Sequence, residues 1–159
     1  GVTTASPLGI VKMELDQRLP SYLEMFLGNR VGSLGEISVL ALLVGAAYLL
    51  YKKQITWHIP VSYIGTVGLL CLMFKRDPLF NIMAGGLILG AFFMATDMVT
   101  SPLTRKGKLA FGVGCGLLTM LIRFTGGFPE GVCYSILIMN MLTPIIDKIS
   151  EPKVFGSLR

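Results

Sequence analysis

Five apolar runs separated by short charged clusters dominate the chain after residue 36. They cover residues 37–51, 54–74, 78–96, 109–122 and 131–146, and none of them contains Asp, Glu, Lys or Arg. A helix needs about 20 residues to cross the roughly 30 Å hydrocarbon core of a bilayer. Two of the runs are short by this measure, but flanking residues can extend them. The pattern therefore predicts five transmembrane helices within residues 34–148.

The opening segment, residues 1–33, has a different pattern. Between residues 10 and 26, apolar and charged side chains alternate at roughly helical spacing, and Pro20 interrupts the series. Since proline breaks the interior of a helix, we expect two short amphipathic helices in the membrane interface, the second capped by Ser21. At the other end, residues 149–159 carry charge again and are expected to form a tail.

The composition indicates an integral membrane protein. Of the 159 residues, 53% are hydrophobic and 14% are charged, whereas a soluble domain carries about 25% charged residues. Mean hydropathy is +0.70. The 14 Lys and Arg residues give a formal net charge of +5, but they flank the apolar runs, where cations set membrane topology. We therefore expect membrane lipid and no nucleic acid as a partner.

Cysteine usage and the first residues add two expectations. The three Cys residues form no CxxC pair, so we predict no metal or iron–sulfur site and expect small buried packing residues. The start of the chain has no signal-peptide pattern and no initiating Met, which suggests a fragment or a processed chain.

The distribution of cations between the loops predicts the orientation. If the first residue is outside, eight Lys and Arg residues lie in the inner loops and tail, and three lie in the outer loops. The inner set is Lys52, Lys53, Arg105, Lys106, Lys108, Lys148, Lys153 and Arg159, and the outer set is Lys75, Arg76 and Arg123. Because inner loops are rich in Lys and Arg, we predict a multi-pass protein with an extracytoplasmic N-terminal segment and a cytoplasmic C-terminus. His58 beside Trp57 is expected to belong to an aromatic belt at the inner surface.

Several polar groups lie at or near the predicted membrane depth. Glu36 enters the first run, Asp97 ends the third and Asp147 ends the fifth. Carboxylates inside a membrane are often functional, although an interfacial or helix-terminal role fits equally well. Gly- or Pro-rich interruptions occur at residues 32–36, 100–102 and 143–144. Together with the odd helix count they suggest half of an inverted repeat with a ligand site at the midplane; close packing through small residues is the alternative.

Four stretches in a fixed order carry a family resemblance. They are residues 1–8 (GVTTASPL), residues 32–36 with Ser38, residues 92–97 (FFMATD) running to 100–102 (TSP), and residues 126–132 (GGFPEGV) continuing through Met139, Asn140, Thr143, Pro144 and Asp147 to 152–156 (PKVFG). In these stretches the chain resembles the C-terminal half of the RnfD family, a membrane component of the Rnf complex, which is an ion-translocating ferredoxin:NAD oxidoreductase. That family is similar to NqrB of the sodium-pumping NADH:quinone reductase. The resemblance implies an all-α integral membrane fold, in which this chain is one half of a urea-transporter-like inverted repeat.

The resemblance also implies a covalent flavin on the opening segment. The family attaches FMN by a phosphoester to the last hydroxyl of a motif of the form Asp-Gly-x-Ser/Thr-x-Ala-Thr/Ser. Thr3, Thr4, Ala5 and Ser6 fill its final four positions, so Ser6 is the implied acceptor, with Thr3 and Thr4 beside it. Without the resemblance, these hydroxyls indicate only a polar turn. The orientation predicted from charge places Ser6 on the outer face, where the family's attaching enzyme works.

A second, non-covalent flavin such as riboflavin is implied within the membrane. The residues expected to line its site are Gly32, Glu36, Thr96, Asp97 and Asn140. The Asn140 amide can donate to and accept from the edge of an isoalloxazine ring; a helix–helix hydrogen bond is the alternative role.

The implied function is that of a membrane subunit that relays electrons between ferredoxin and NAD, coupled to movement of Na⁺ or H⁺, in a bacterial or archaeal cell membrane. The other membrane subunits and the iron–sulfur subunits of the Rnf complex would be its partners. The chain has no Gly-rich dinucleotide fingerprint and no cluster-binding Cys, so we predict no catalytic residue and no complete reaction by this chain alone. Three alternatives stay open: the quinone reductase subunit, a solute channel or transporter without a redox role, and a structural anchor for redox partners.

Overall fold

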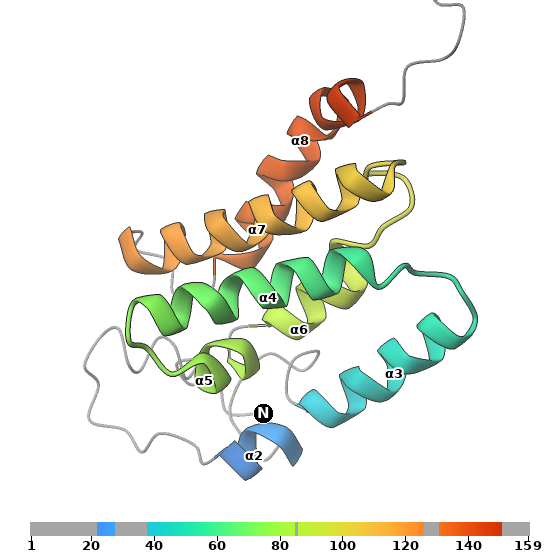
Figure 1. The fold of residues 1–159 in the computed structure, drawn as a ribbon. Helices are drawn as coiled ribbons and strands as arrows, with labels where there is room; N and C mark the ends of the chain where they lie inside the picture. Colours follow the sequence, from blue (N-terminus) through green and yellow to red (C-terminus); the bar gives the residue numbers. More distant parts are fainter. Residues whose placement is uncertain (1–21, 28–37, 85, 126–130, 151–159) are drawn as a thin grey trace, which may run out of the picture.

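The computed structural model describes residues 22–27, 38–84, 86–125 and 131–150, and every regular element within these ranges is helical (Figure 1). The elements are α2 (Tyr22–Leu27), α3 (Val39–Tyr51), α4 (His58–Met73), α5 (Pro78–Met83), α6 (Leu87–Leu89), the π-helix η2 (Gly90–Met94), α7 (Arg105–Thr125) and α8 (Val132–Ser150). Each of the five apolar runs contains helix, as predicted. By length and composition α7 and α8 can each cross a membrane, whereas α3 and α4 are shorter apolar helices. The described residues therefore fit an all-helical membrane protein.

Helix α7 begins before the apolar run at residue 109, because Thr104 caps it. The backbone N–H of Gly107 donates to Oγ1 of Thr104 at 3.0 Å, and the N–H of Lys108 donates to the carbonyl of Thr104 at 2.9 Å. These bonds satisfy N–H groups that have no partner within the helix. The cap draws Arg105, Lys106 and Lys108 into the first turns of α7.

The third apolar run is broken, where the sequence predicts one helix. Ala84, just after α5, has an extended backbone with φ −89° and ψ 154°, and Gly86 has a φ of +64°, a left-handed conformation that favours glycine. The chain then continues through α6 and η2, where the N–H of Ala95 donates to the carbonyl of Gly90 at 2.7 Å. This i to i+5 bond is the mark of a π-helix. Small residues in an apolar run also suit close packing, so the sequence alone does not reveal the break.

Helices α4 and α7 run side by side and form the centre of the fold, with α8 packed on the other side of α7 (Figure 1). Small residues permit the close approach of α4 and α7. A Cβ added to Gly112 would lie 1.9 Å from Oγ of Ser62, and one added to Gly116 would lie 2.7 Å from Cβ of Thr66. A Gly-x-x-x-Gly face on α7 therefore packs against a Ser-x-x-x-Thr face on α4, as in membrane helix pairs.

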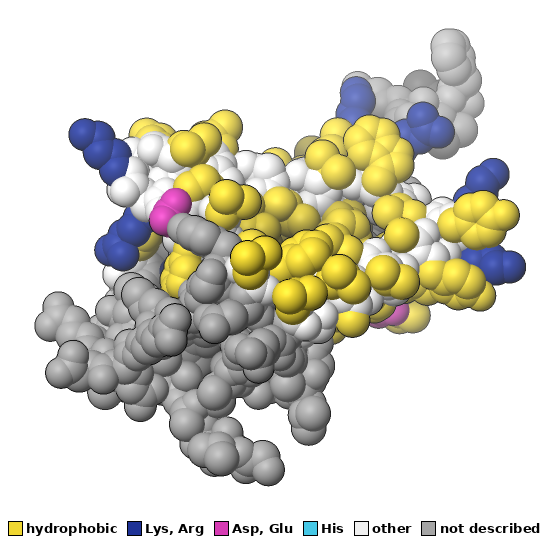
Figure 2. All heavy atoms as spheres, turned by 90° about the horizontal axis from the view of Figure 1, so that it is seen from below, with side chains coloured by type: hydrophobic (Ala, Val, Ile, Leu, Met, Phe, Trp, Pro, Cys, Tyr) yellow, Lys and Arg dark blue, Asp and Glu magenta, His cyan; other side chains and the backbone are white. Residues whose placement is uncertain are grey.

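The core lies between α4, α7, α8 and η2, and apolar side chains also cover the outside. The fully buried members of the core include Ile59, Tyr63, Val67, Leu87, Phe111 and Cys115. Figure 2 shows hydrophobic side chains over the middle of one face, with Lys and Arg side chains at its two ends. An apolar belt between two cationic ends is what a bilayer requires, because the middle contacts hydrocarbon and the ends contact headgroups.

The cysteines follow the sequence prediction in part. Cys71 and Cys115 are buried and free, as expected for packing residues. Cys133, on α8, is exposed, so the expectation of burial is wrong for this residue. Only 22% of the most apolar window of α8 is buried, which explains why an apolar position on this helix faces outward.

Candidate functional site

Five of the residues predicted to bind flavin lie outside the described residues: Thr3, Thr4, Ser6, Gly32 and Glu36. The two amphipathic helices predicted within residues 1–33 are described only as α2 (Tyr22–Leu27), which follows Pro20. The structure does place the other three predicted residues, Thr96, Asp97 and Asn140, together with the elements that carry them.

Thr96 and Asp97 follow η2 directly, and their surroundings differ. Thr96 is buried, and its hydroxyl donates to the carbonyl of Phe92 at 2.7 Å. This bond covers one carbonyl at the end of the π-helix. Asp97 is exposed, and its Oδ2 accepts a hydrogen bond from the Thr100 hydroxyl at 3.2 Å. Asp97 therefore organises the turn that leaves the third apolar run.

Asn140 lies in the middle of α8 next to the buried Met139. Its Oδ1 atom is buried and has no hydrogen-bond partner among the described residues. A buried amide oxygen without a partner costs about 1–3 kcal/mol, so this position is suited to an external donor. None of the described hydrogen bonds joins Asn140 to Thr96 or Asp97, so the structure does not assemble the three into one site.

The loop after Asp97 is fastened to the C-terminal half of α8. The Thr143 hydroxyl donates to the carbonyl of Thr100 at 2.9 Å, and Oδ1 of Asp147 accepts from the N–H of Leu103 at 3.0 Å. The Thr104 hydroxyl also donates to Oγ of Ser150 at 2.6 Å. Of the two roles left open for Asp147, these contacts support the helix-terminal one: its carboxylate holds a loop.

Arg123 has a position that the sequence does not predict. The charge pattern assigns it to an outer loop, but it lies in the last turn of α7 and is only 7% exposed. Its Nη1 donates to the carbonyl of Asn81 at 2.7 Å, and its Nη2 donates to the carbonyl of Ala84 at 3.4 Å. These carbonyls belong to the C-terminal end of α5, where the partial charge is negative and favours a cation. Arg123 thus stabilises the break in the third apolar run from a helix about 40 residues away.

Three hydroxyl groups form a second polar cluster that the sequence does not reveal. The Tyr63 hydroxyl is 2.6 Å from Oγ1 of Thr119 and 3.1 Å from Oγ of Ser135, and the last two are 2.7 Å apart. The hydroxyls of Thr119 and Ser135 also reach the carbonyls of Cys115 and Val132, at 2.8 and 2.7 Å. The cluster joins α4, α7 and α8 deep in the core. Hydroxyl residues inside apolar runs were the available signal, but their convergence depends on helix packing.

The described residues hold buried polar groups without a metal centre. No three His, Cys, Asp or Glu side chains gather closely enough to hold a metal ion in the described part of the chain. What remains for chemistry is a broken apolar helix stabilised by Arg123, a π-helix that ends at Thr96, and the unpaired amide oxygen of Asn140. Such groups can bind and orient a polar ligand between helices.

Comparison with known proteins gives matches along almost the whole chain. The model of the NQR2, RnfD, RnfE family matches residues 1–156. Three relatives are each the D-type subunit of an ion-translocating complex. The chain is 54% identical to that of the proton-translocating ferredoxin:NAD(+) oxidoreductase complex of Clostridium ljungdahlii, with 99% of this chain and 52% of the relative covered. It is 48% identical to that of the Na(+)-translocating ferredoxin:NAD(+) oxidoreductase complex of Acetobacterium woodii, with 98% and 49% covered. For the ion-translocating oxidoreductase complex of Stutzerimonas stutzeri the identity is 42%, with 98% and 49% covered. The chain therefore spans about half the length of these relatives.

Proposed function

This chain belongs to the NQR2, RnfD, RnfE family, and from that premise we propose that it forms part of the flavin-carrying membrane subunit of an ion-translocating ferredoxin:NAD oxidoreductase. The observation that carries the proposal is the family match over residues 1–156, together with 54% and 48% identity to two relatives named as subunits of such complexes. One of these relatives is named for protons and the other for Na⁺, so the proposed ion is H⁺ or Na⁺. The other subunits of the complex are the proposed partners.

The proposed cofactor is FMN, joined through its phosphate to the hydroxyl of Ser6. The redox chemistry belongs to the flavin, and the protein contributes its position and surroundings. Support comes from the order of Thr3, Thr4, Ala5 and Ser6 in the opening segment. A covalent bond keeps a water-soluble cofactor at the membrane surface. The electrons would reach and leave this flavin through partner subunits that carry the iron–sulfur centres and the NAD site.

The proposed membrane arrangement has five spans within residues 34–148, with residues 1–33 outside and residues 149–159 inside. The spans would be α3, α4, the broken segment from α5 to η2, α7 and α8. The positions of the cations support this arrangement. Lys53, Arg105 and Lys108 lie around one pocket, whereas Arg76 lies with Phe124 at the opposite end of α7, its guanidinium 5.9 Å from the ring centre.

The odd number of proposed spans supports one half of an inverted repeat. The break at Ala84 and Gly86 agrees with such a fold, because inverted-repeat membrane proteins place discontinuous helices beside a ligand site. A second, non-covalent flavin is proposed for this interior. Asn140 fits its chemistry, since a buried amide oxygen without a partner can accept a hydrogen bond from a ring N–H.

In-gel flavin fluorescence tests the proposed function. The full-length subunit is coexpressed with its flavin transferase, denatured, separated and illuminated, and wild type is compared with Ser6→Ala and with Thr3→Val as a matched control. The proposal predicts a fluorescent band for wild type and Thr3→Val and a dark band for Ser6→Ala. A dark wild-type band would remove the covalent carrier and favour a transporter or an anchor.

The quinone reductase subunit is the second candidate, because the matching family description includes NQR2 beside RnfD. The electron acceptor separates the two. Membranes that contain the wild-type complex should reduce NAD⁺ with reduced ferredoxin under the first proposal, and should reduce a quinone with NADH under the second.

A further inference from the structure

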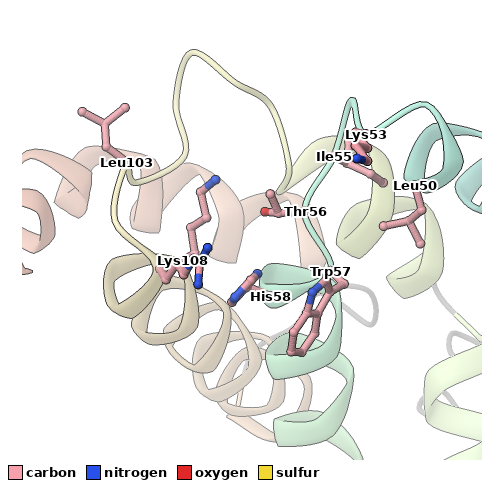
Figure 3. A pocket seen from close by; sticks show the side chains of 9 residues that line it. Leu50, Lys53, Ile55, Thr56, Trp57, His58, Leu103 and Lys108 are labelled. Carbon is pink, nitrogen blue, oxygen red and sulfur yellow. The ribbon is translucent and has the colours of Figure 1, made fainter.

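A cationic pocket lies where the loop between α3 and α4 meets the start of α7 (Figure 3). Its volume is about 450 Å³, and its lining residues are Leu50, Lys53, Ile55, Thr56, Trp57, His58, Leu103, Arg105 and Lys108. The pocket is separate from the break at Ala84 and from Asn140. Nothing in the proposed electron transfer uses it.

The charges around this pocket are all of one sign. Lys53, Arg105 and Lys108 line it, and no Asp or Glu from the described part of the chain does so. Two of these cations, Arg105 and Lys108, occupy the first turns of α7, which contain no acidic residue. Cations near a helix N-terminus oppose the helix dipole. An anion bound between the three side chains would relieve both their mutual repulsion and this opposition.

Helix α4 adds hydrogen-bonding groups at the same place. Its N-cap, Trp57, supplies no side-chain hydrogen bond to the first turn. His58 follows, and its Nδ1 is buried without a partner among the described residues. The two rings are stacked, with centroids 4.4 Å apart and an interplanar angle of 27°. Figure 3 shows the imidazole of His58 between the indole of Trp57 and the side chain of Lys108.

The remaining wall of the pocket is apolar and faces outward. Leu50, Ile55 and Leu103 contribute aliphatic side chains, and Leu103 is 80% exposed. Trp57 is 58% exposed, as expected for an aromatic residue at the level of lipid headgroups. A ligand that fits this wall has an anionic end and a hydrocarbon end.

We propose that this pocket binds the phosphate of an anionic phospholipid, with the acyl chains lying over the apolar wall. Basic pockets between membrane helices bind such headgroups. The lipid would hold the loop between α3 and α4 against the start of α7. The leaflet is the one that the positive-inside rule assigns to the cytoplasm. The proposal depends on membrane insertion and is independent of the flavin.

Lipid binding to the purified full-length subunit tests this assignment. The subunit is stripped of lipid in detergent, and binding of phosphatidylglycerol is measured by native mass spectrometry. The pocket variant combines Lys53→Gln, Arg105→Gln and Lys108→Gln. The control variant combines Lys52→Gln, Lys106→Gln and Lys148→Gln, which removes the same charge from cations of the predicted inner set that do not line the pocket. We expect the pocket variant to bind at least about 10-fold more weakly, the cost of losing one or more charge-assisted hydrogen bonds, and the control to stay close to wild type.

Three results would overturn the proposal. Equal loss in both variants would mean that only general surface charge attracts lipid. Equal binding of phosphatidylcholine would mean that net negative charge is not selected. Displacement of the lipid by glycerol phosphate or inorganic phosphate at similar concentration would identify a soluble phosphate ligand instead.

A charge-preserving variant guards against misfolding. Lys53→Arg, Arg105→Lys and Lys108→Arg together should retain lipid binding, while the single Lys108→Gln should weaken it; retention by neither or by both contradicts the proposal. In-gel flavin fluorescence of the same samples shows separately whether the flavin proposal holds.

Discussion

The packing of α4 against α7 leads to a sharp prediction at Gly112. In Gly112→Ala the new Cβ would meet Oγ of Ser62 at 1.9 Å and the backbone carbonyl of Ile59 at 2.8 Å. The serine side chain can rotate, but it then loses its hydrogen bond to the carbonyl of His58, now 2.8 Å long. The backbone of Ile59 cannot rotate away, so the helices have to separate. Overpacking of this kind costs about 1–3 kcal/mol.

A matched control isolates that cost from helix propensity. Alanine in place of glycine favours a helix by about 1 kcal/mol, and this gain is common to both variants. A Cβ at Gly65, on α4, would meet nothing within 4 Å. Gly65→Ala should therefore be neutral or stabilising, and Gly112→Ala should be less stable than Gly65→Ala by about 2 kcal/mol.

The assay is thermal unfolding of the full-length subunit in detergent, with both variants and wild type at the same protein and detergent concentrations. The unfolding midpoint of Gly112→Ala should lie several degrees below that of Gly65→Ala, since about 1 kcal/mol shifts the midpoint by roughly 2–4 °C in a domain of this size. Adding Ser62→Ala to Gly112→Ala should recover part of the loss, because it removes the contact to Oγ but not the contact to the carbonyl of Ile59. Equal midpoints for the two glycine variants would refute the close packing of α4 and α7.

Three further predictions concern the polar contacts between helices. Tyr63→Phe should cost about 1 kcal/mol in thermal unfolding, because Thr119 and Ser135 keep their carbonyl acceptors; a loss of folding would show that the cluster is held mainly by the tyrosine. Arg123→Gln should speed hydrogen exchange of the amides in α5 far more than in α8, because the carbonyls of Asn81 and Ala84 lose a charged donor; uniform exchange would contradict a local role. Asp147→Ala should raise hydrogen exchange at the amide of Leu103, which now donates to the carboxylate at 3.0 Å, and an unchanged rate would argue against this anchor.

Much of the helical layout is predictable from the sequence, because it depends on local pattern. The charged clusters at Lys52–Lys53 and at residues 75–77 mark where apolar helix stops, and the structure has α3 and α4 ending near them. Inner-set cations converge in space as well: Lys53 and Arg105 line one pocket although they are far apart in the chain. From the sequence these cations indicate only orientation, since their convergence with His58 depends on how α4 packs against α7.

The break in the third apolar run could not be predicted for a physical reason. The residues at the break are small and apolar, and they suit close packing as well as a helix end. What selects the break is tertiary: Arg123 on α7 supplies donors for the carbonyls of Asn81 and Ala84. An arginine near the end of an apolar run is more simply interpreted as a loop cation. Asn140 is a candidate by residue type alone, whereas its unpaired buried oxygen is visible only after packing.

The central claim is that the protein carries FMN on Ser6, and peptide mass mapping tests it most directly. The full-length subunit, coexpressed with its flavin transferase, is digested with trypsin, and the peptide that ends at Lys12 is fragmented. The account predicts that this peptide carries the mass of FMN less one water, with the added mass on Ser6, and that Ser6→Ala abolishes it. An unmodified peptide from the wild-type protein, or a modification confined to Thr3 or Thr4, would contradict the assignment.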